Sequence, residues 1–385
     1  MRPFLGFRRA SGRPGVRNHT LVLSVTGLTT PAARRIARSL NGVVVLGTQH
    51  DSGLLGYDRK VHRGALAAFA CHPNVGGVVV IGANAPVVEQ VAAAAEAAGR
   101  LVEAITLDAC GHDVLTLSDK ALRAAAGFVH GLSHQRREEL PPAGLLLGLE
   151  CGRSDPSSGL VANPLVGAVV DRLVDAGGAA IFGETTEWIG AEEPLVRKAR
   201  DATVAERLKA AAARRESMAQ AAGIDLTGNN PSQTNIDAGL SSIEEKSLGA
   251  IAKAGSRPIQ GVIGYGEPPP GPGVWAMDAP AYAPESLTGF STAGANMALF
   301  TTGVGNSYVS ALMPTLKLTG NPATARRVGQ QLEFEASAVF TGEESLDAAA
   351  DRMVDRLLEI ASGALTWGEI LGEGDEAISR FGAVL

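Results

Sequence analysis

The first 110 residues alternate short, β-branched apolar segments with longer segments of helical spacing, and this rhythm restricts the possible folds more than any other feature. The segments with strand character are residues 20–26, 43–47, 77–81 and 101–106, and helix-like segments at 30–40 and 86–98 lie between them. Strands that alternate with helices form a parallel sheet with helices on its faces. We therefore predict an α/β fold whose first domain, residues 1–140, is a Rossmann-like parallel sheet.

The rest of the chain predicts a second, larger α/β domain at residues 141–385. Residues 113–136 have the pattern of a helix, and the charged, proline-containing segment 136–142 that follows is typical of a linker. The further strands are expected at residues 144–149, 179–182, 258–263, 297–301 and 315–318. We expect one or two helices at 192–222, a loop at 223–240, an irregular proline-rich loop at 265–273 and an amphipathic helix at 345–361. A chain of 385 residues is long enough for two such domains.

Composition limits the partners and the compartment. A net charge of −6 argues against a nucleic acid or an anionic membrane as partner, since both attract basic surfaces. Three cysteines are too few for a disulfide framework, and the amino terminus lacks the apolar core of a signal peptide. No apolar run reaches the length of a membrane-spanning helix. We therefore expect a cytoplasmic protein with no nucleic-acid or membrane partner.

The segment 148–163 carries the densest set of reactive side chains. It lies between the apolar strand at 144–149 and a segment of helical spacing at 164–174, where ligands bind in open α/β sheets. Its polar residues are Glu150, Cys151, Ser154, Asp155 and Asn163. The alternative interpretation is a capped helix start without a ligand, in which the cysteine is a small buried residue. No packing requirement calls for all five residues together, so we expect chemistry here.

Several motif-like segments point to a family. They occur in order at residues 12–18, 72–76, 148–163, 177–192, 239–249, 300–305 and 317–322. Together they resemble the altronate/galactarate dehydratase family, which also includes the large subunit of sulfolactate sulfo-lyase. The resemblance implies β-elimination of water, or of sulfite, from a small 2-hydroxy acid to give a 2-oxo acid, with Fe²⁺ as cofactor. Many members carry a small amino-terminal domain, or a separate small subunit, that this chain lacks, so the resemblance implies a separate small subunit as partner. We also expect a homo-oligomer.

The expected chemistry assigns roles to polar residues in the matching segments. Removing a proton next to a carboxylate requires a base, an acid for the leaving group and a positive charge beside the enediolate. The catalytic candidates are His50, Glu150, Asp155, Glu184, Glu187 and Lys246. The substrate-binding candidates are Arg13, Arg17, Asn18, Ser154, Asn163, Thr302, Gly303 and Lys317, because guanidinium, ammonium and amide groups bind carboxylates.

The first domain departs from the family pattern at its metal-binding residues. Cysteines that the family carries there are replaced at Gly27, Leu54 and Ala85, none of which can ligate a metal. If those thiols serve the family's iron, this chain has changed or lost that site. A substitute site is predicted from His50, Cys110, His112 and Cys151, because imidazole and thiolate suit iron or zinc.

Three functions remain open from the sequence. The leading hypothesis is a hydro-lyase acting on a sugar acid or related hydroxy acid. The second is a lyase that expels another group, such as sulfite, with an altered metal site or none, and the third is a non-catalytic binding subunit. The pair Glu184 and Glu187 could instead begin a solvated helix, and Ser242 with Glu245 fits a capping box. A nicotinamide dehydrogenase is disfavoured because no G-x-G-x-x-G follows the first strand.

Overall fold

The computed structural model describes residues 1–51, 53–226, 230–380 and 382, and it confirms the α/β prediction. The chain divides into two compact units. The small unit comprises Leu5–Leu140 together with Asp375–Leu385, and the large unit comprises Met1–Phe4 and Pro141–Gly374.

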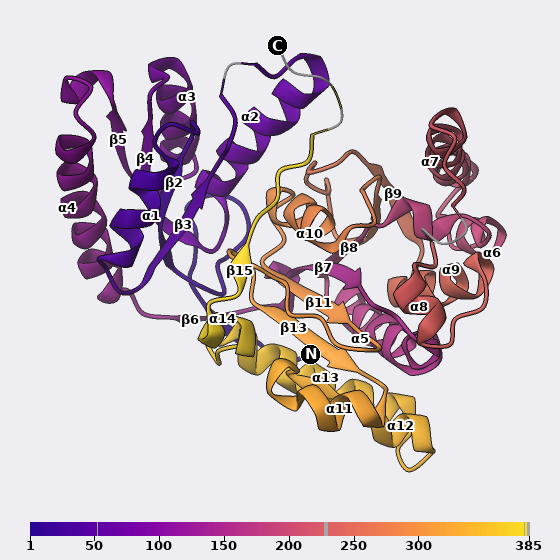
Figure 1. The fold of residues 1–385 in the computed structure, drawn as a ribbon. Helices are drawn as coiled ribbons and strands as arrows, with labels where there is room; N and C mark the ends of the chain where they lie inside the picture. Colours follow the sequence, from indigo (N-terminus) through magenta and orange to yellow (C-terminus); the bar gives the residue numbers. More distant parts are fainter. Residues whose placement is uncertain (52, 227–229, 381, 383–385) are drawn as a thin grey trace. The chain divides into compact units, whose positions relative to one another are not determined.

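The small unit is built on a four-stranded parallel sheet in the order β3-β2-β4-β5 (Figure 1). Its strands are β2 (His19–Ser24), β3 (Val43–Gly47), β4 (Val75–Gly82) and β5 (Leu101–Thr106), and its helices are α1 (Thr30–Arg38), α2 (Gly56–Cys71), α3 (Ala85–Ala97) and α4 (Val114–Ser133). Strand β4 is buried throughout, as expected for a central parallel strand covered on both faces. Short strand β6 (Glu138–Leu140) lies inside the predicted linker and pairs with β1 (Phe4–Gly6).

The large unit is built on a seven-stranded parallel sheet in the order β14-β13-β11-β7-β8-β10-β9. Its strands are β7 (Leu146–Cys151), β8 (Ala179–Phe182), β9 (Ile259–Ile263), β10 (Gly273–Met277), β11 (Met297–Thr301), β13 (Thr315–Thr319) and β14 (Phe334–Glu335). Strand β7 is the fourth of the seven, so the residues that follow it lie in the middle of the carboxyl edge. This order brings segments far apart in the sequence to one edge (Figure 1).

Helices connect these strands in the large unit. They are α5 (Asn163–Asp175), α6 (Glu192–Val196), α7 (Ala202–Ala221), α8 (Gln233–Asp237), α9 (Ile243–Ile251), α10 (Ala283–Thr292), α11 (Pro322–Val328), α12 (Ser337–Thr341), α13 (Leu346–Ala361) and α14 (Trp367–Leu371). The segment predicted as one or two helices forms two, α6 and α7. The predicted loop at 223–240 contains the short helix α8, and its residues 227–229 lie outside the described part. The proline-rich segment 265–273 is irregular up to the start of β10, as predicted.

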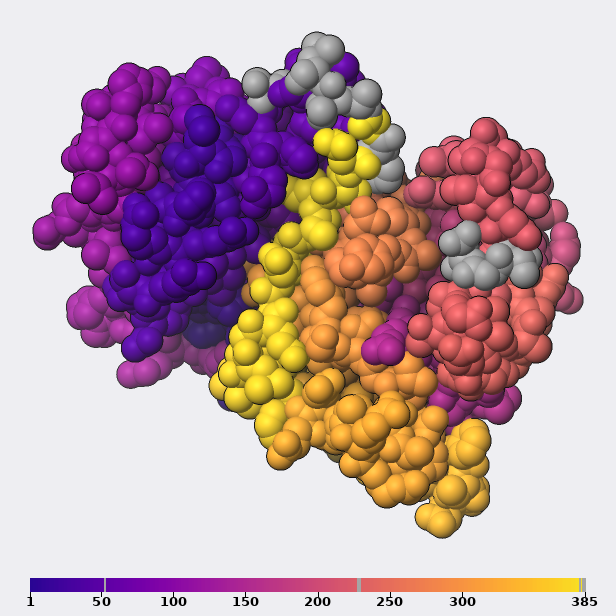
Figure 2. Space-filling model, viewed as in Figure 1, coloured from indigo at the N-terminus to yellow at the C-terminus, as the bar shows by residue number. Residues whose placement is uncertain are grey.

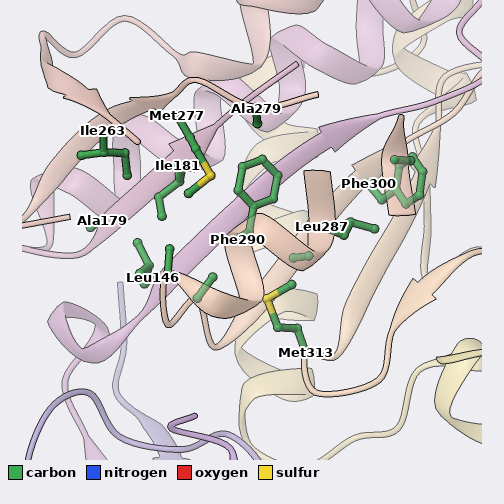
Figure 3. Close-up of a cluster of buried hydrophobic side chains, with 14 residues drawn as sticks. Leu146, Ala179, Ile181, Ile263, Met277, Ala279, Leu287, Phe290, Phe300 and Met313 are labelled. Carbon is green, nitrogen blue, oxygen red and sulfur yellow. The ribbon is translucent and has the colours of Figure 1, made fainter. Parts of the chain in front are cut away.

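Helix α10 packs its apolar side on one face of this sheet (Figure 3). Phe290 and Leu287 of the helix contact a buried cluster that includes Leu146 and Ile181 of the strands. The close approach requires a glycine at position 148, because a Cβ there would lie 2.8 Å from the Cβ of Phe290. This packing fixes β7, the strand that carries the reactive segment.

A search of the described residues for a helix both long and apolar enough to cross a membrane finds none.

Candidate active site

Reactive side chains of the large unit gather where β7 and β8 end. Strand β7 ends at Glu150 and Cys151, and Glu184 follows β8 after a single glycine. Glu184 has left-handed backbone angles, φ 61° and ψ 53°, and so does Arg153 after β7, with φ 55°. Residues with side chains rarely adopt this conformation, and strain of this kind concentrates at functional sites. Only one other non-glycine residue of the described chain, His112 of the small unit, has a positive φ.

A buried cluster forms between these strand ends and helix α9. The Sγ atom of Cys151 lies 3.3 Å from Oε1 of Glu184 and 3.2 Å from Oε2 of Glu187. Lys253 donates from Nζ to this sulfur at 3.1 Å and forms an ion pair with Glu184. Lys246 forms an ion pair with Glu187. Three acidic groups and two ammonium groups are thus joined in one network from which water is largely excluded.

The network shifts the protonation of its two paired carboxyl groups in opposite directions. Burial, reinforced by Glu187, raises the pKa of Glu184 to about 7, although Lys253 opposes that rise. Burial also acts on Glu187, but the charges of Lys246 and Lys253 outweigh it and hold its pKa below the ordinary value. A carboxyl group with a pKa near neutrality can exchange protons efficiently at physiological pH.

Two further acidic groups of the cluster are held in their neutral forms. Burial, together with Glu184, raises the pKa of Glu150 well above its usual range, and it raises the pKa of the Cys151 thiol as well. The hydroxyl group of Ser286 in α10 opposes the shift at Glu150. Both carboxyl oxygens of Glu150 are fully buried and have no hydrogen-bond partner among the described residues within ordinary bonding geometry. Such a group in a native fold calls for a functional explanation.

A narrow pocket reaches the cluster from the surface. In the space-filling view, magenta atoms of the large unit lie recessed between its orange and red surfaces (Figure 2). The pocket is lined by Cys151, Ser154, Asp155, Ser158, Gly159, Asn163, Leu240, Glu245, Lys246, Gly249 and Ala250. The Ser154 hydroxyl is buried and lacks a hydrogen-bond partner among the described residues, so the pocket wall carries an unused polar group.

Asp155 is surrounded by donors that fix the adjoining loops. Its Oδ1 atom accepts from the Ser157 hydroxyl at 2.6 Å and from the Ser158 N–H at 3.0 Å, and its Oδ2 atom accepts from Nδ2 of Asn321 at 2.7 Å. Gly303 allows this arrangement, because a Cβ at that position would lie 2.4 Å from the Asp155 carboxyl carbon. These contacts indicate that Asp155 and Gly303 position the loops after β7 and β11.

The other candidates of the large unit are also tied to the framework. Asn163 accepts from the Thr301 hydroxyl at 2.6 Å and donates to the Gly249 carbonyl at 3.0 Å. The Thr302 hydroxyl accepts from the Gly305 N–H at 3.0 Å. Lys317 is fully buried on β13, with its ammonium group 3.5 Å from a carboxyl oxygen of Glu373.

The candidates of the small unit lie at both edges of its sheet. His50 follows β3 and packs edge-on against the ring of His62, with the ring centres 5.9 Å apart. Cys110 is buried in an apolar cluster under α4. His112 is exposed and pairs with Asp108 at 3.3 Å.

The residues of the 12–18 motif lie before β2, at the amino edge of the same sheet. Burial lowers the pKa of Arg13. Arg17 is buried and donates to the Val16 carbonyl at 2.9 Å. Asn18 accepts from Arg9 at 2.9 Å and donates to Gln135 at 3.0 Å. The contacts made by Asn18 thus tie this motif to the framework of the small unit.

The donor set of the buried cluster fits a metal ion. One ligand atom each from Cys151, Glu184 and Glu187 lies within 4.8 Å of the other two, and no other group of three such residues occurs in the described chain. The predicted ligands His50, Cys110 and His112 therefore form no such group with one another. Three acidic groups, Cys151, Glu184 and Glu187, face two ammonium groups, so their full ionisation leaves one negative charge. A bound cation would compensate that charge, and thiolate and carboxylate ligands suit divalent transition metals.

Sequence analysis missed two residues of the site, Lys253 and Ser286. Lys253 is seven residues after Lys246, a spacing that places both side chains on one face of a continuous helix. That periodicity was the available signal. No sequence signal points to Ser286, because only the packing of α10 on the sheet brings this residue close to Glu150.

Comparison with known proteins decides the family. The family model described as "D-galactarate/Altronate dehydratase, C-terminal" matches residues 143–384, and the model of the second domain of D-galactarate dehydratase/altronate hydrolase matches residues 6–132. The chain belongs to this family. Its members are curated as dehydratases and lyases, so the chain is an enzyme of the lyase class, within a family of carbon–oxygen lyases.

Individual relatives differ in how much of their length this chain matches. It is 35% identical to the (2R)-sulfolactate sulfo-lyase subunit beta of Chromohalobacter salexigens, over 98% of this chain and 97% of the relative. It is 30% identical to the altronate dehydratase of Escherichia coli, over 98% of this chain and 78% of the relative. The galactarate dehydratase (L-threo-forming) of Escherichia coli is 31% identical over 64% of this chain and 47% of the relative.

Proposed function

We propose that this chain eliminates water from a sugar acid or a related 2-hydroxy acid and releases a 2-oxo acid. The observation that supports this most is the pair of unequal carboxyl groups in the buried cluster. Glu184 has a pKa of about 7, whereas the pKa of Glu150 lies far above its ordinary range. Two titratable groups whose environments push their pKa values apart are the usual pattern of a base and an acid.

The proposed reaction uses both groups. Glu184 takes the proton from the carbon next to the substrate carboxylate, and the electron pair forms a carbon–carbon double bond as the neighbouring carbon–oxygen bond breaks. Glu150 donates its proton to the departing hydroxide, and the resulting enol rearranges to the 2-oxo acid. The ammonium groups of Lys246 and Lys253 stabilise the negative charge that builds up on the substrate carboxylate.

A divalent metal, Fe²⁺ by family resemblance, would be held by Cys151, Glu184 and Glu187. When bound, it supplies positive charge next to the enediolate. Each residue would contribute one ligand atom, and the Glu184 oxygen that accepts from Lys253 would be the one that takes the proton. Lys253 orients that carboxylate through their ion pair.

Three acids test the proposal: altronate with one carboxylate, galactarate with two, and (2R)-sulfolactate with a carboxylate and a sulfonate. The purified chain is incubated anaerobically with each, with and without Fe²⁺, and 2-oxo acid and sulfite are measured. We expect a 2-oxo acid from at least one of them and its loss in Glu184→Gln. Absence of any 2-oxo acid after iron loading would contradict the proposal.

Sulfite is the second candidate leaving group. The end-to-end match to a sulfolactate sulfo-lyase subunit favours it, because the match to altronate dehydratase leaves about a fifth of that protein uncovered. Sulfite departs with its electron pair and needs no proton, whereas hydroxide does. Glu150→Gln should therefore slow elimination of water far more than elimination of sulfite.

We also propose a cytoplasmic assembly with a separate small subunit and further copies of this chain. The name of the Chromohalobacter relative, a beta subunit, supports the small subunit. Expression of the chain alone and together with its genomic neighbours, followed by mass measurement in solution, tests this. A monomer that is fully active by itself would contradict it.

A further inference from the structure

Arg153 is a strained residue at the proposed site that the reaction described above does not use. It is the second residue after β7 and has a φ of 55°. Its carbonyl accepts two hydrogen bonds, from the Gly303 N–H at 3.2 Å and the Val304 N–H at 3.1 Å. The loop after β11 thus fixes the backbone of Arg153 in a conformation that glycine would adopt without strain.

The Arg153 side chain is exposed, and no hydrogen bond or ion pair of its guanidinium group occurs among the described residues. Its neighbour Ser154 lines the pocket with a buried hydroxyl that also lacks a partner among those residues, and Cys151 lines the same pocket two positions earlier. One turn therefore carries an unused cation and an unused hydroxyl donor. Guanidinium groups bind planar carboxylates and tetrahedral oxyanions through paired hydrogen bonds.

The other cations near the cluster are already paired. Lys253 is bound to Glu184, Lys246 to Glu187, and Lys317 lies against Glu373. These pairs leave no uncompensated positive charge for a second acidic group on the substrate. Arg153 is the residue on the β7 turn that can supply it.

We propose that Arg153 binds a second acidic group of the substrate, a carboxylate or a sulfonate at the end remote from the reacting carboxylate. This inference rests on the proposed elimination reaction and predicts that acids with two negative groups are preferred over acids with one. Arg153 is then a specificity-determining residue, and the Ser154 hydroxyl adds a second donor to the same group.

A purely structural role for Arg153 predicts different behaviour. Glycine at this position relieves the backbone strain and keeps the carbonyl that holds Gly303 and Val304. Arg153→Gly should therefore fold at least as stably as the parent chain, so a loss of activity would not come from unfolding. Arg153→Lys keeps a positive charge without the paired donors, and Arg123→Ala removes an exposed arginine from α4 of the small unit as a matched control.

The experiment compares kcat/KM for galactarate, (2R)-sulfolactate and altronate in these variants, with thermal unfolding measured in parallel. For the acid with two negative groups that is turned over, Arg153→Gly should lower kcat/KM roughly 10- to 100-fold, mainly through KM, as expected for the loss of a charged hydrogen-bonded contact. Arg153→Lys should recover part of the loss, while turnover of altronate and the unfolding midpoint should not fall. A comparison of the losses for galactarate and (2R)-sulfolactate shows whether Arg153 binds a carboxylate or a sulfonate.

A second readout separates this inference from the proposed function. Protection against thermal unfolding by malate, 3-sulfopropanoate and lactate is measured in the parent chain and in Arg153→Gly, without turnover. Loss of protection by the two-acid ligands alone supports the inference even if no substrate reacts. Equal loss for altronate and galactarate, unchanged kcat/KM for the two-acid substrates, or unchanged protection by malate and 3-sulfopropanoate would overturn it.

Discussion

Both units place polar side chains at the carboxyl ends of parallel strands, yet those groups are satisfied in very different ways. In the small unit, the Ser24 hydroxyl donates to the Thr26 carbonyl at 2.8 Å, and the Thr48 hydroxyl lies 2.6 Å from Nε2 of His62. In the large unit, Glu150 is buried without a hydrogen-bond partner among the described residues, and Glu184 is held in a strained conformation. Parallel strand ends therefore carry hydrogen-bonded hydroxyl groups in the small unit and a cluster of reactive acidic groups in the large unit.

The contrast shows how a site is distinguished from a well-packed strand end. Hydroxyl groups can satisfy one another at little cost, whereas several carboxyl groups and a thiol around two ammonium groups cannot all ionise without a further cation. Buried groups of this kind call for a functional explanation. The comparison can be tested by substituting charged residues of the buried cluster in the large unit and by protonating a buried histidine of the small unit.

Lys253→Met should have the largest effect. It removes a buried cation from between Glu184 and Cys151, so the ionised partners lose their compensating charge. Breaking a buried ion pair from one side costs about 3–5 kcal/mol, and we expect activity to vanish as well. Chemical denaturation measures the free energy of unfolding. The control is Lys209→Met, which removes an exposed ion pair with Glu193. It should lower the free energy of unfolding by no more than about 1 kcal/mol. An equal loss of stability in both variants would refute the special role of Lys253.

Protonation of His62 should produce the next largest effect, confined to the small unit. Burial, with smaller contributions from the charges of His50 and Arg63, lowers the pKa of His62 from 6.5 to about 4. The unfolded chain therefore takes up this proton first, and stability is lost as the pH falls from about 6.5 towards 4, by up to about 3 kcal/mol.

Unfolding of the parent chain and of His62→Gln over this pH range measures that loss. Glutamine can keep a hydrogen bond to Thr48 but does not titrate, so the variant should lack this part of the pH dependence. Parallel pH profiles for the two proteins would show that His62 does not contribute.

Binding of a divalent cation should stabilise the large unit. At a free concentration 100 times its Kd, a cation that binds only the folded chain adds about 2.7 kcal/mol to the free energy of unfolding. Cys151→Ser should weaken this effect because it replaces a ligand of the cluster, whereas Cys71→Ser should not. Calorimetry with and without a chelator measures the shift, and an undiminished shift in Cys151→Ser would place the metal elsewhere.

Cys110→Ala should have the smallest effect. The thiol packs in the apolar cluster under α4, so its removal should cost about 1 kcal/mol through lost contacts. Elemental analysis of the purified variant tests the sequence prediction that Cys110 binds metal. A lower metal content would support that prediction and shift attention to the small unit.

The sequence predicts most of the strands of both sheets, because short β-branched segments such as 43–47 and 179–182 are unambiguous. It does not predict α2, whose apolar residues are interrupted by charged residues and Gly64, or α10, whose apolar residues are interrupted by glycine, serine and threonine. Their helical state depends on packing against the sheets. The strand order of the large sheet also had no local signal, because it depends on which edges pair over long sequence distances.

Individual residues of the site show the same limit. The segment after β7 was identifiable from its composition, and the motif after β8 directed attention to Glu184 and Glu187. The proximity of these residues to Lys253 required the fold. The predicted set of His50, Cys110, His112 and Cys151 combined residues by ligand type alone, without a spacing that would bring them together.

Lys246 and Lys253 belong to one continuous helical segment, α9 and the 3₁₀ turn that follows it. The two cations therefore cannot be adjusted independently: inserting a single residue between them would rotate the second ammonium group by about 100° around the helix axis. Deletions and insertions in this segment are thus far more damaging than most point substitutions. A change of substrate preference is therefore expected through single side chains such as Arg153 and not through a change in the length of α9.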